Sequence, residues 1–310
     1  MANKHIDEAT GTETVGHEWD GIEELNTPLP RWWVWTFYAT IVFAIGYVIA
    51  YPAIPLLTHG TAGLLGWTSR GQLAEDLSAQ SEARAKAVAG LAEMPIEQLP
   101  AHPALEQAAI AGGAAAFKVN CIQCHGAGAA GIAGSYPNLS DDDWLWGGDL
   151  KAIETTIAHG IRSTEDPDTR VSEMPAFGRD GLLTGQQIGQ VADHVLSLSG
   201  KGADNAAGAQ LFEQNCAVCH GAGGKGNRSL GAPNLTDAIW LYGKTPGAIT
   251  KPEIESVIAN ARNSVMPAWG HRLDAVTIKE LAAYVHSLGG GEDFVDESAA
   301  PPADQVNDQP

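Results

Sequence analysis

The sequence contains little sulfur and little positive charge. Its 310 residues include four cysteines, and all four lie in two short strings: residues 121–125 read CIQCH and residues 216–220 read CAVCH. No thiol is left for a disulfide elsewhere, a catalytic nucleophile or a separate metal cluster. The 18 Lys and Arg residues are outnumbered by 37 Asp and Glu residues, which gives a net charge of −19. Because nucleic acids are bound by a basic face, this balance argues against a nucleic-acid-binding protein.

Both strings have the form C-x-x-C-H, the attachment signature of a c-type haem. Two thiols one helical turn apart can each add to a vinyl group on the same edge of a porphyrin, and the adjacent His can donate an imidazole nitrogen to the iron. The sequence therefore predicts two covalently bound haem c groups. The haem thiols are Cys121, Cys124, Cys216 and Cys219, and the proximal iron ligands are His125 and His220.

Three other uses of a C-x-x-C pair compete with haem attachment. The two pairs could together hold one zinc ion as a Cys₄ site, and either pair could be a thioredoxin-like redox motif or a disulfide. None of these requires a His directly after the second Cys, and both copies have one. The sequence therefore favours haem.

Two of the four methionines are candidates for the second axial ligand of each iron. Met174 follows His125 by 49 residues, Met266 follows His220 by 46 residues, and a Pro comes after each Met. A Met thioether opposite His is the usual axial pair of a cytochrome c and raises the reduction potential. We expect each Met to bind the haem of its own repeat, because each repeat reads as a complete fold; a crossed pairing stays open. Met94 precedes both motifs and is interpreted as linker.

Residues 32–51 carry no charge and predict a transmembrane helix. Twenty residues span roughly 30 Å as a helix, the thickness of a bilayer core, and aromatic residues gather at both ends of the stretch. The alternative, a buried core helix, is disfavoured by this length and by the aromatic ends. Residues 1–31 contain seven acidic residues and neither a basic start nor an early apolar run, so we expect a cytoplasmic segment rather than a cleavable signal peptide.

The chain after about residue 108 contains two similar segments, one around each C-x-x-C-H motif. They are offset by about 95 residues, a normal size for a small domain. Each copy reads as a helix, the haem motif, a Gly-rich loop, a helix, the Met loop and a last helix, which is expected near 184–198 in the first copy and 274–288 in the second. The predicted fold class is mainly α: one N-terminal transmembrane helix followed by two tandem cytochrome c-type haem domains. The expected boundaries are a periplasmic linker at 52–107 with an Ala-rich helix at 71–94, haem domains at 108–200 and 203–290, and a disordered acidic tail at 291–310. His159, His194, His271 and His286 have no counterpart in the opposite repeat and are interpreted as surface or capping residues.

Residues 16–24, GHEWDGIEE, and the aromatic start of the apolar stretch resemble the string that precedes the membrane span in one family. With the two haem repeats behind a single anchor, residues 16–290 resemble the dihaem subunit, called CcoP or FixP, of cbb3-type cytochrome c oxidases. A generic dihaem cytochrome does not carry the N-terminal string. Some members of the family have an extra N-terminal span, which this chain does not show.

The resemblance implies a subunit that performs no oxygen chemistry of its own. Its haems would take electrons from a periplasmic or membrane-bound cytochrome c and pass them, by way of a monohaem cytochrome subunit, to the catalytic haem–copper subunit, which reduces oxygen and moves protons. Two other functions stay open: an electron carrier for another membrane complex, such as a periplasmic dehydrogenase, and a dihaem peroxidase. A peroxidase would need an iron with an open or displaceable position, whereas both repeats offer a Met.

Charge and chemistry together predict the topology. Arg31 abuts the start of the apolar stretch, and no further Lys or Arg occurs before Arg70, so the positive-inside rule puts the N-terminus in the cytoplasm of a bacterium. Covalent haem attachment takes place outside the cytoplasm, which likewise requires residues 56–310 to be periplasmic. Protease added to spheroplasts should therefore remove both haem domains, whereas protection of these domains with cleavage of the N-terminal segment would contradict the predicted orientation.

Overall fold

The computed structural model describes residues 4–237, 239–244 and 248–294. It divides into two compact units, Met1–Ala83 and Arg84–Pro310, and each is described on its own. The predicted mainly helical class is confirmed.

The first unit starts with a hairpin that the sequence analysis did not predict. Strand β1, Thr14–Trp19, pairs antiparallel with β2, Ile22–Leu25. Asp20 and Gly21 connect them with positive φ values of 55° and 83°, the conformation that Asp-Gly favours in a two-residue hairpin turn. The Asp-Gly pair was therefore an overlooked signal for this hairpin.

Helix α1, Arg31–Ala50, has a mean hydropathy of 1.7 and no buried residue. A core helix of this length would bury one face, so its exposure fits lipid contact and the predicted span at 32–51. In the described part of the chain, α1 is the one helix long and apolar enough to cross a membrane. Helix α2 covers Ser69–Ala87 and ends seven residues before the predicted limit. Gly90 follows in the left-handed region, with φ 88°, where a helix does not continue.

The second unit contains the two haem motifs and eight α-helices among its described residues. The first repeat supplies α3 (Pro103–Asn120), α4 (Ile122–His125), α5 (Leu150–His159) and α6 (Gly185–Leu198), together with the short 3₁₀ helices η1 (Ile96–Ala101) and η2 (Ala127–Ala129). The second repeat supplies α7 (Ala206–Asn215), α8 (Ala217–His220), α9 (Lys251–Asn260) and α10 (Ala275–His286). The two predicted last helices are thus α6 and α10, within two residues of their expected bounds.

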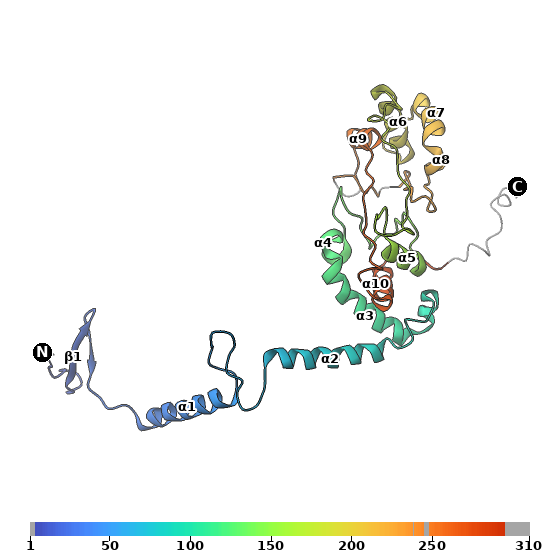
Figure 1. Ribbon diagram of the computed structural model, residues 1–310. Coiled ribbons are helices and arrows are strands. Elements are labelled where there is room, and N and C mark those ends of the chain that lie inside the picture. Colours follow the sequence, from blue (N-terminus) through green and yellow to red (C-terminus); the bar gives the residue numbers. More distant parts are fainter. Residues whose placement is uncertain (1–3, 238, 245–247, 295–310) are drawn as a thin grey trace. The chain divides into compact units, whose positions relative to one another are not determined.

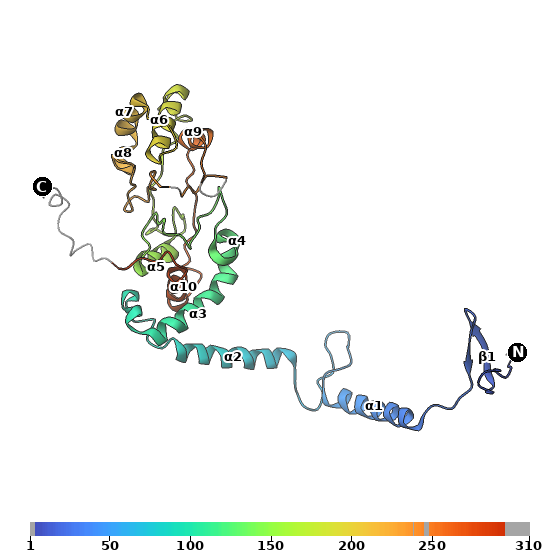
Figure 2. The same ribbon diagram turned by 180° about the vertical axis from the view of Figure 1, so that it is seen from behind.

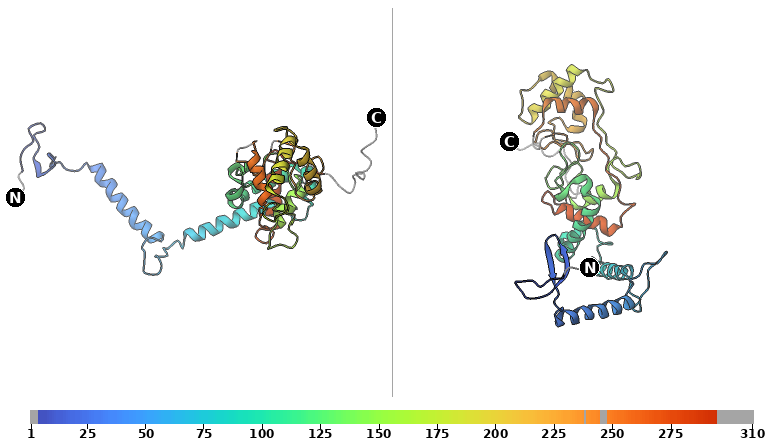
Figure 3. Two further views of the ribbon diagram at one scale, coloured as in Figure 1. Left: turned by 90° about the horizontal axis from the view of Figure 1, so that it is seen from above. Right: turned by 90° about the vertical axis from the view of Figure 1, so that its left-hand side faces the viewer.

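The two repeats exchange their last helices. Helix α10 of the second repeat packs on α3 and α5 of the first, and α6 of the first repeat packs on α7 and α9 of the second. In Figures 1 and 2, α6, α7, α8 and α9 accordingly form one end of the second unit, and α3, α5 and α10 form the other. The right-hand view of Figure 3 shows the same division from the side. The expectation that each repeat is a complete fold is therefore wrong. Seven residues join α6 to α7, and a connection this short favours packing of the two helices against each other.

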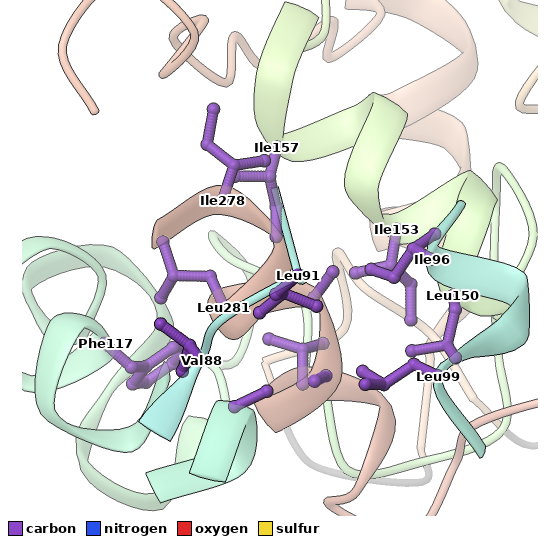
Figure 4. Packing of buried hydrophobic residues seen from close by; sticks show 14 of the residues in the cluster. Val88, Leu91, Ile96, Leu99, Phe117, Leu150, Ile153, Ile157, Ile278 and Leu281 are labelled. Atoms are coloured by element: carbon purple, nitrogen blue, oxygen red, sulfur yellow. The ribbon is translucent and has the colours of Figure 1, made fainter. Parts of the chain in front are cut away.

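Each exchanged pair has its own hydrophobic core. The first cluster joins α3, α5, α10 and the segment around η1, and Figure 4 shows Phe117, Ile157 and Leu281 converging from three helices. The second cluster joins α6, α7 and α9 around Val191, Phe212 and Ile254. Both cores therefore contain residues from both repeats.

Glycines at matching positions let the exchanged helices approach closely. Gly113 of α3 and Gly208 of α7 each lie eight residues before the first Cys of a motif. A Cβ atom added to Gly113 would lie 1.9 Å from the backbone oxygen of Glu280 in α10, and one added to Gly208 would lie 2.0 Å from that of Gln190 in α6. Since neither backbone oxygen could give way without moving its helix, any side chain here would separate the helix pair.

The start of the predicted tail is ordered by contacts with the body of the second unit. The Glu292 carboxylate accepts a hydrogen bond of 2.8 Å from the backbone N–H of Gly148 and one of 2.7 Å from the Arg228 guanidinium. Glu292 therefore departs from the expectation of a disordered tail that begins at residue 291. Residues 295–310 lie outside the described residues.

Two charged side chains of α10 fasten the end of the linker. The Lys279 ammonium donates to the backbone oxygens of Leu91, Ala92 and Met94 at 3.0, 3.0 and 2.6 Å. The Arg84 guanidinium donates to both carboxylate oxygens of Glu280, at 3.2 and 2.6 Å. The side chain of Glu280 is only 1% exposed, so its charge depends on this partner.

Replacing Arg84 should therefore destabilise the second unit. Arg84→Met leaves the buried Glu280 carboxylate without its cation, and we expect the free energy of unfolding to fall by about 2 kcal/mol. Chemical denaturation of the haem-loaded chain in detergent measures this change. Arg179→Met is the matched control, because both partners of the Arg179–Asp180 pair are largely exposed, and it should cost at most about 0.5 kcal/mol. Equal losses in the two variants would contradict the role given to Arg84.

Candidate haem sites

Each motif lies on one short helical turn at the end of a longer helix. In the first, α3 ends at Asn120 and α4 carries the motif, with the backbone N–H of Cys124 donating to the Cys121 oxygen at 3.1 Å and that of His125 donating to the same oxygen at 2.9 Å. The second motif repeats both bonds, at 3.1 and 2.9 Å, on the oxygen of Cys216. A glycine with positive φ ends each turn, Gly126 at 76° and Gly221 at 75°. The turn therefore holds two thiols and one imidazole together.

Both motif histidines are prepared to act as neutral ligands. The Nδ1 atom of His125 lies 3.3 Å from the backbone oxygen of Pro137, and that of His220 lies 3.1 Å from the oxygen of Pro233. A carbonyl oxygen can only accept, so each Nδ1 carries the proton and each Nε2 keeps a lone pair for a metal. Burial lowers the pKa of both imidazoles and so favours the same neutral form. The hydrogen bond to the Pro oxygen raises the pKa, but by less than burial lowers it.

The thiols do not form the Cys₄ zinc site that the sequence left open. Burial, and secondarily the neighbouring thiol, raises the pKa of Cys121 and of Cys216 to about 11. Moreover, Cys121 packs against the first cluster and Cys216 against the second. Each motif therefore belongs to a different core.

The two methionines lie in the cores opposite to those expected. Met266 packs against the first cluster, which contains Cys121, and Met174 packs against the second, which contains Cys216. This packing favours the crossed pairing over the expected pairing within each repeat, and which Met binds which haem stays a prediction. The physical reason is the helix exchange, because each Met loop leads directly into the exchanged helix and is carried with it.

Hydrogen bonds fix each Met loop on the opposite repeat. The Asn263 side chain accepts from the backbone N–H of Met174 and donates to its backbone oxygen, both at 3.0 Å. Met266 exchanges two backbone bonds with Ile161, at 3.0 and 2.9 Å. Farther along, the N–H of Phe177 donates to the oxygen of Ile258 in α9, and the N–H of Trp269 donates to the oxygen of Ile157 in α5. The two Met loops are thus anchored to the ends of the corresponding helices α9 and α5. The additional side-chain bonds from Asn263 are made to the Met174 loop.

Three buried N–H donors of the second unit could serve an additional anionic group. The Nε1 atoms of Trp146 and Trp240 and the Nε atom of Arg170 are buried and have no hydrogen-bond partner among the described residues. Trp240 packs against the second cluster, and the Arg170 guanidinium lies 5.0 Å from the centre of the Trp146 ring. Buried N–H groups are costly without acceptors, and the carboxylates of a haem are acceptors of the required kind. The sequence analysis did not predict Trp146, Arg170 or Asn263 as functional residues.

Asn263 gives a direct test of the cross-repeat anchoring. Asn263→Ala removes both bonds to the Met174 backbone, and at about 1 kcal/mol for each bond we expect amide hydrogen exchange at Met174 to accelerate about 10- to 30-fold. Asn260→Ala is the matched control, because its side chain bonds only within α9, to the Ser256 oxygen. Exchange at Met174 that is unchanged in Asn263→Ala, or equally faster in Asn260→Ala, would contradict the anchoring.

Two family models match this chain. The family described as the N-terminal domain of cytochrome oxidase-cbb3, FixP, matches residues 11–58. The family described as cytochrome C oxidase, cbb3-type, subunit III, matches residues 108–195 and 203–285.

Similar full-length proteins carry corresponding names. A cbb3-type cytochrome c oxidase subunit FixP of Sinorhizobium medicae is 52% identical over 293 residues, which cover 94% of this chain and 99% of that protein. A FixP subunit of Azorhizobium caulinodans is 53% identical over 93% of this chain and 96% of the relative. A CcoP subunit of Cereibacter sphaeroides is 53% identical over 90% and 95%. The chain therefore belongs to the FixP/CcoP family of cbb3-type cytochrome c oxidase subunits.

Proposed function

We propose that the chain binds two haem c groups and carries electrons within a cbb3-type cytochrome c oxidase. The observation that supports this most strongly is that each core combines one C-x-x-C-H turn with one Met. A haem held in this way supplies reversible one-electron exchange at its iron. A haem held by one His and one Met would be suited to electron transfer rather than to substrate binding.

The ligand sets follow the exchanged packing. The first site would use Cys121 and Cys124 for attachment, with His125 and Met266 as axial ligands. The second would use Cys216 and Cys219, with His220 and Met174. The peroxidase alternative needs an iron with an open or displaceable position, and a Met packed into each core disfavours it.

The chain's own residues would keep both sites rigid and dry. Phe117 and Phe212 are fully buried, each four residues before the first Cys of its motif. His125 and His220 are oriented by the backbone oxygens of Pro137 and Pro233. Little rearrangement of protein or water would then accompany a change of charge, which suits rapid electron exchange.

The partners follow from the family. As the names of the relatives describe oxidase subunits, the chain would assemble with the catalytic haem–copper subunit and the monohaem cytochrome subunit. Helix α1 would anchor it in the bacterial inner membrane, with the N-terminal segment cytoplasmic and the haem domains periplasmic. The acidic balance of residues 56–310 would favour a cytochrome c donor, free or membrane-bound, that docks through basic residues.

A variant that can attach only one haem tests whether the iron is bound by the Met of its own repeat or by the Met of the other repeat. With Cys121 and Cys124 both changed to Ser, only the second motif can hold haem. In that background we expect Met174→Leu to open the iron to CO and lower its potential, while Met266→Leu leaves both unchanged. The reciprocal background, with Cys216 and Cys219 changed to Ser, should reverse the two results. Sensitivity of each haem to the Met of its own repeat would contradict the crossed assignment.

Oxygen uptake by the purified oxidase complex tests the function itself. Reduced cytochrome c should support slower uptake when either Met is replaced in the otherwise intact subunit, because a lower potential at one haem impedes transfer along the path. The catalytic haem and copper contents serve as the control for assembly. If both variants assemble normally and turn over at the wild-type rate, the chain does not carry the electrons.

A further inference from the structure

Four side chains that the haem sites do not use meet beside the Met266 loop. They are His159, the last residue of α5; Asp166 and Asp168 in the loop that follows; and His271, five residues after Met266. We call this group the His–Asp cluster. Three of its members come from the first repeat and His271 from the second, so the sequence alone gave no reason to combine them.

The cluster has the dimensions of a metal site. The Nδ1 atom of His159 lies 3.2 and 3.1 Å from the two carboxylate oxygens of Asp166, and the Nε2 atom of His271 lies 3.5 Å from one of them. Ligand atoms bound at 2.0–2.1 Å around a tetrahedral zinc are separated by about 3.3 Å. One ligand atom each from His159, Asp166 and Asp168 also lie within 4.8 Å of one another. Small side-chain movements would thus bring the ligands into place.

The central carboxylate is fixed, while the other groups can be reached from solvent. The side chain of Asp166 is 7% exposed, and one of its oxygens accepts the backbone N–H of Asp168 at 2.8 Å. The side chains of His159 and His271 are 36% and 58% exposed, and Asp168 is exposed. An ion could therefore enter from outside and bind to a pre-oriented acid. The nearby Glu165 is paired with Arg272 at 2.9 Å and is not free to replace Asp168.

The cluster is not part of the repeated haem framework. In the second repeat, Asn260 occupies the position of His159 at the end of the corresponding helix, since Ile157-Ala158 matches Ile258-Ala259. The segment from the motif His to Met is three residues longer in the first repeat, 49 against 46, and the Asp166 loop lies in that longer segment. Haem binding, which both repeats share, therefore does not account for these four residues.

We propose that the His–Asp cluster binds one divalent transition-metal ion. Two imidazoles with carboxylates suit zinc and similar ions of intermediate softness, whereas calcium and magnesium prefer oxygen ligands alone. The bound ion would link the Asp166 loop of the first repeat to the segment that carries Met266. It would thereby reinforce the exchanged arrangement at the same place as the Ile161–Met266 backbone bonds.

Zinc is the probe for this site. The full-length, haem-loaded chain, freed of any polyhistidine tag, is titrated with Zn²⁺ in a calorimeter and its zinc content is measured after desalting. We expect one zinc per chain and a higher thermal unfolding temperature, since an ion that binds the folded state stabilises it. The His271→Ala variant should bind zinc at least about 100-fold more weakly, because even the loss of outer-shell partners costs 10–100-fold. In zinc X-ray absorption, two imidazole ligands are expected in the wild type.

The control variant is His194→Ala. His194 also pairs with a carboxylate, Asp204 at 2.8 Å, but no second His lies in that pair. This variant should bind zinc as the wild type does. His271 is largely exposed, so its replacement should leave the haem content and the unfolding temperature without zinc unchanged, and both are measured. If the wild type retains no zinc, or if His271→Ala binds zinc with wild-type affinity, the cluster is only a hydrogen-bonded surface group and the proposal is overturned.

Discussion

The second unit depends on one packing constraint: each haem motif is enclosed by a helix from the other repeat. Helix α10 covers α3, and α6 covers α7, with Gly113 and Gly208 allowing the backbones to come close. A repeat on its own would lack the helix that completes its core and the Met that packs there. The two cores should therefore form and unfold together, because each is built from helices of both repeats.

This arrangement has a consequence for electron transfer. The Met174 loop is attached to α9 of the second repeat through Phe177 and Ile258, and the Met266 loop to α5 of the first through Trp269 and Ile157. A displacement of one repeat relative to the other would thus disturb an axial ligand of both proposed haems. The exchanged helices place both sites in one compact unit rather than in two separately folded domains.

The end of the linker, from Arg84 onward, packs against the first core of the second unit. Lys279 and Glu280, neighbours on α10, bind the segment between Arg84 and Met94, and Leu91 and Leu99 are buried in the first cluster. The exchanged helix therefore also holds the chain that leads toward the membrane helix. Burying the charges of a Lys and a Glu is costly unless each has a hydrogen-bond or ion-pair partner. Here Lys279 has three backbone oxygens and Glu280 has Arg84.

The local chemistry of this protein can be read from short stretches of its sequence. The C-x-x-C-H spacing, the uncharged run at 32–51 and the 3.6-residue periodicity of the last helices are local patterns, so helix α1, the haem turns and the mainly helical class could be predicted from them. Tertiary structure alone decided which Met lies beside which motif, because matching repeats offer equivalent surfaces and either pairing satisfies the same pattern. It also brought Lys279 to the backbone oxygens of Leu91, Ala92 and Met94, and His271 to Asp166 from about a hundred residues away. Such contacts depend on how helices pack in space, which periodicity along one chain does not encode.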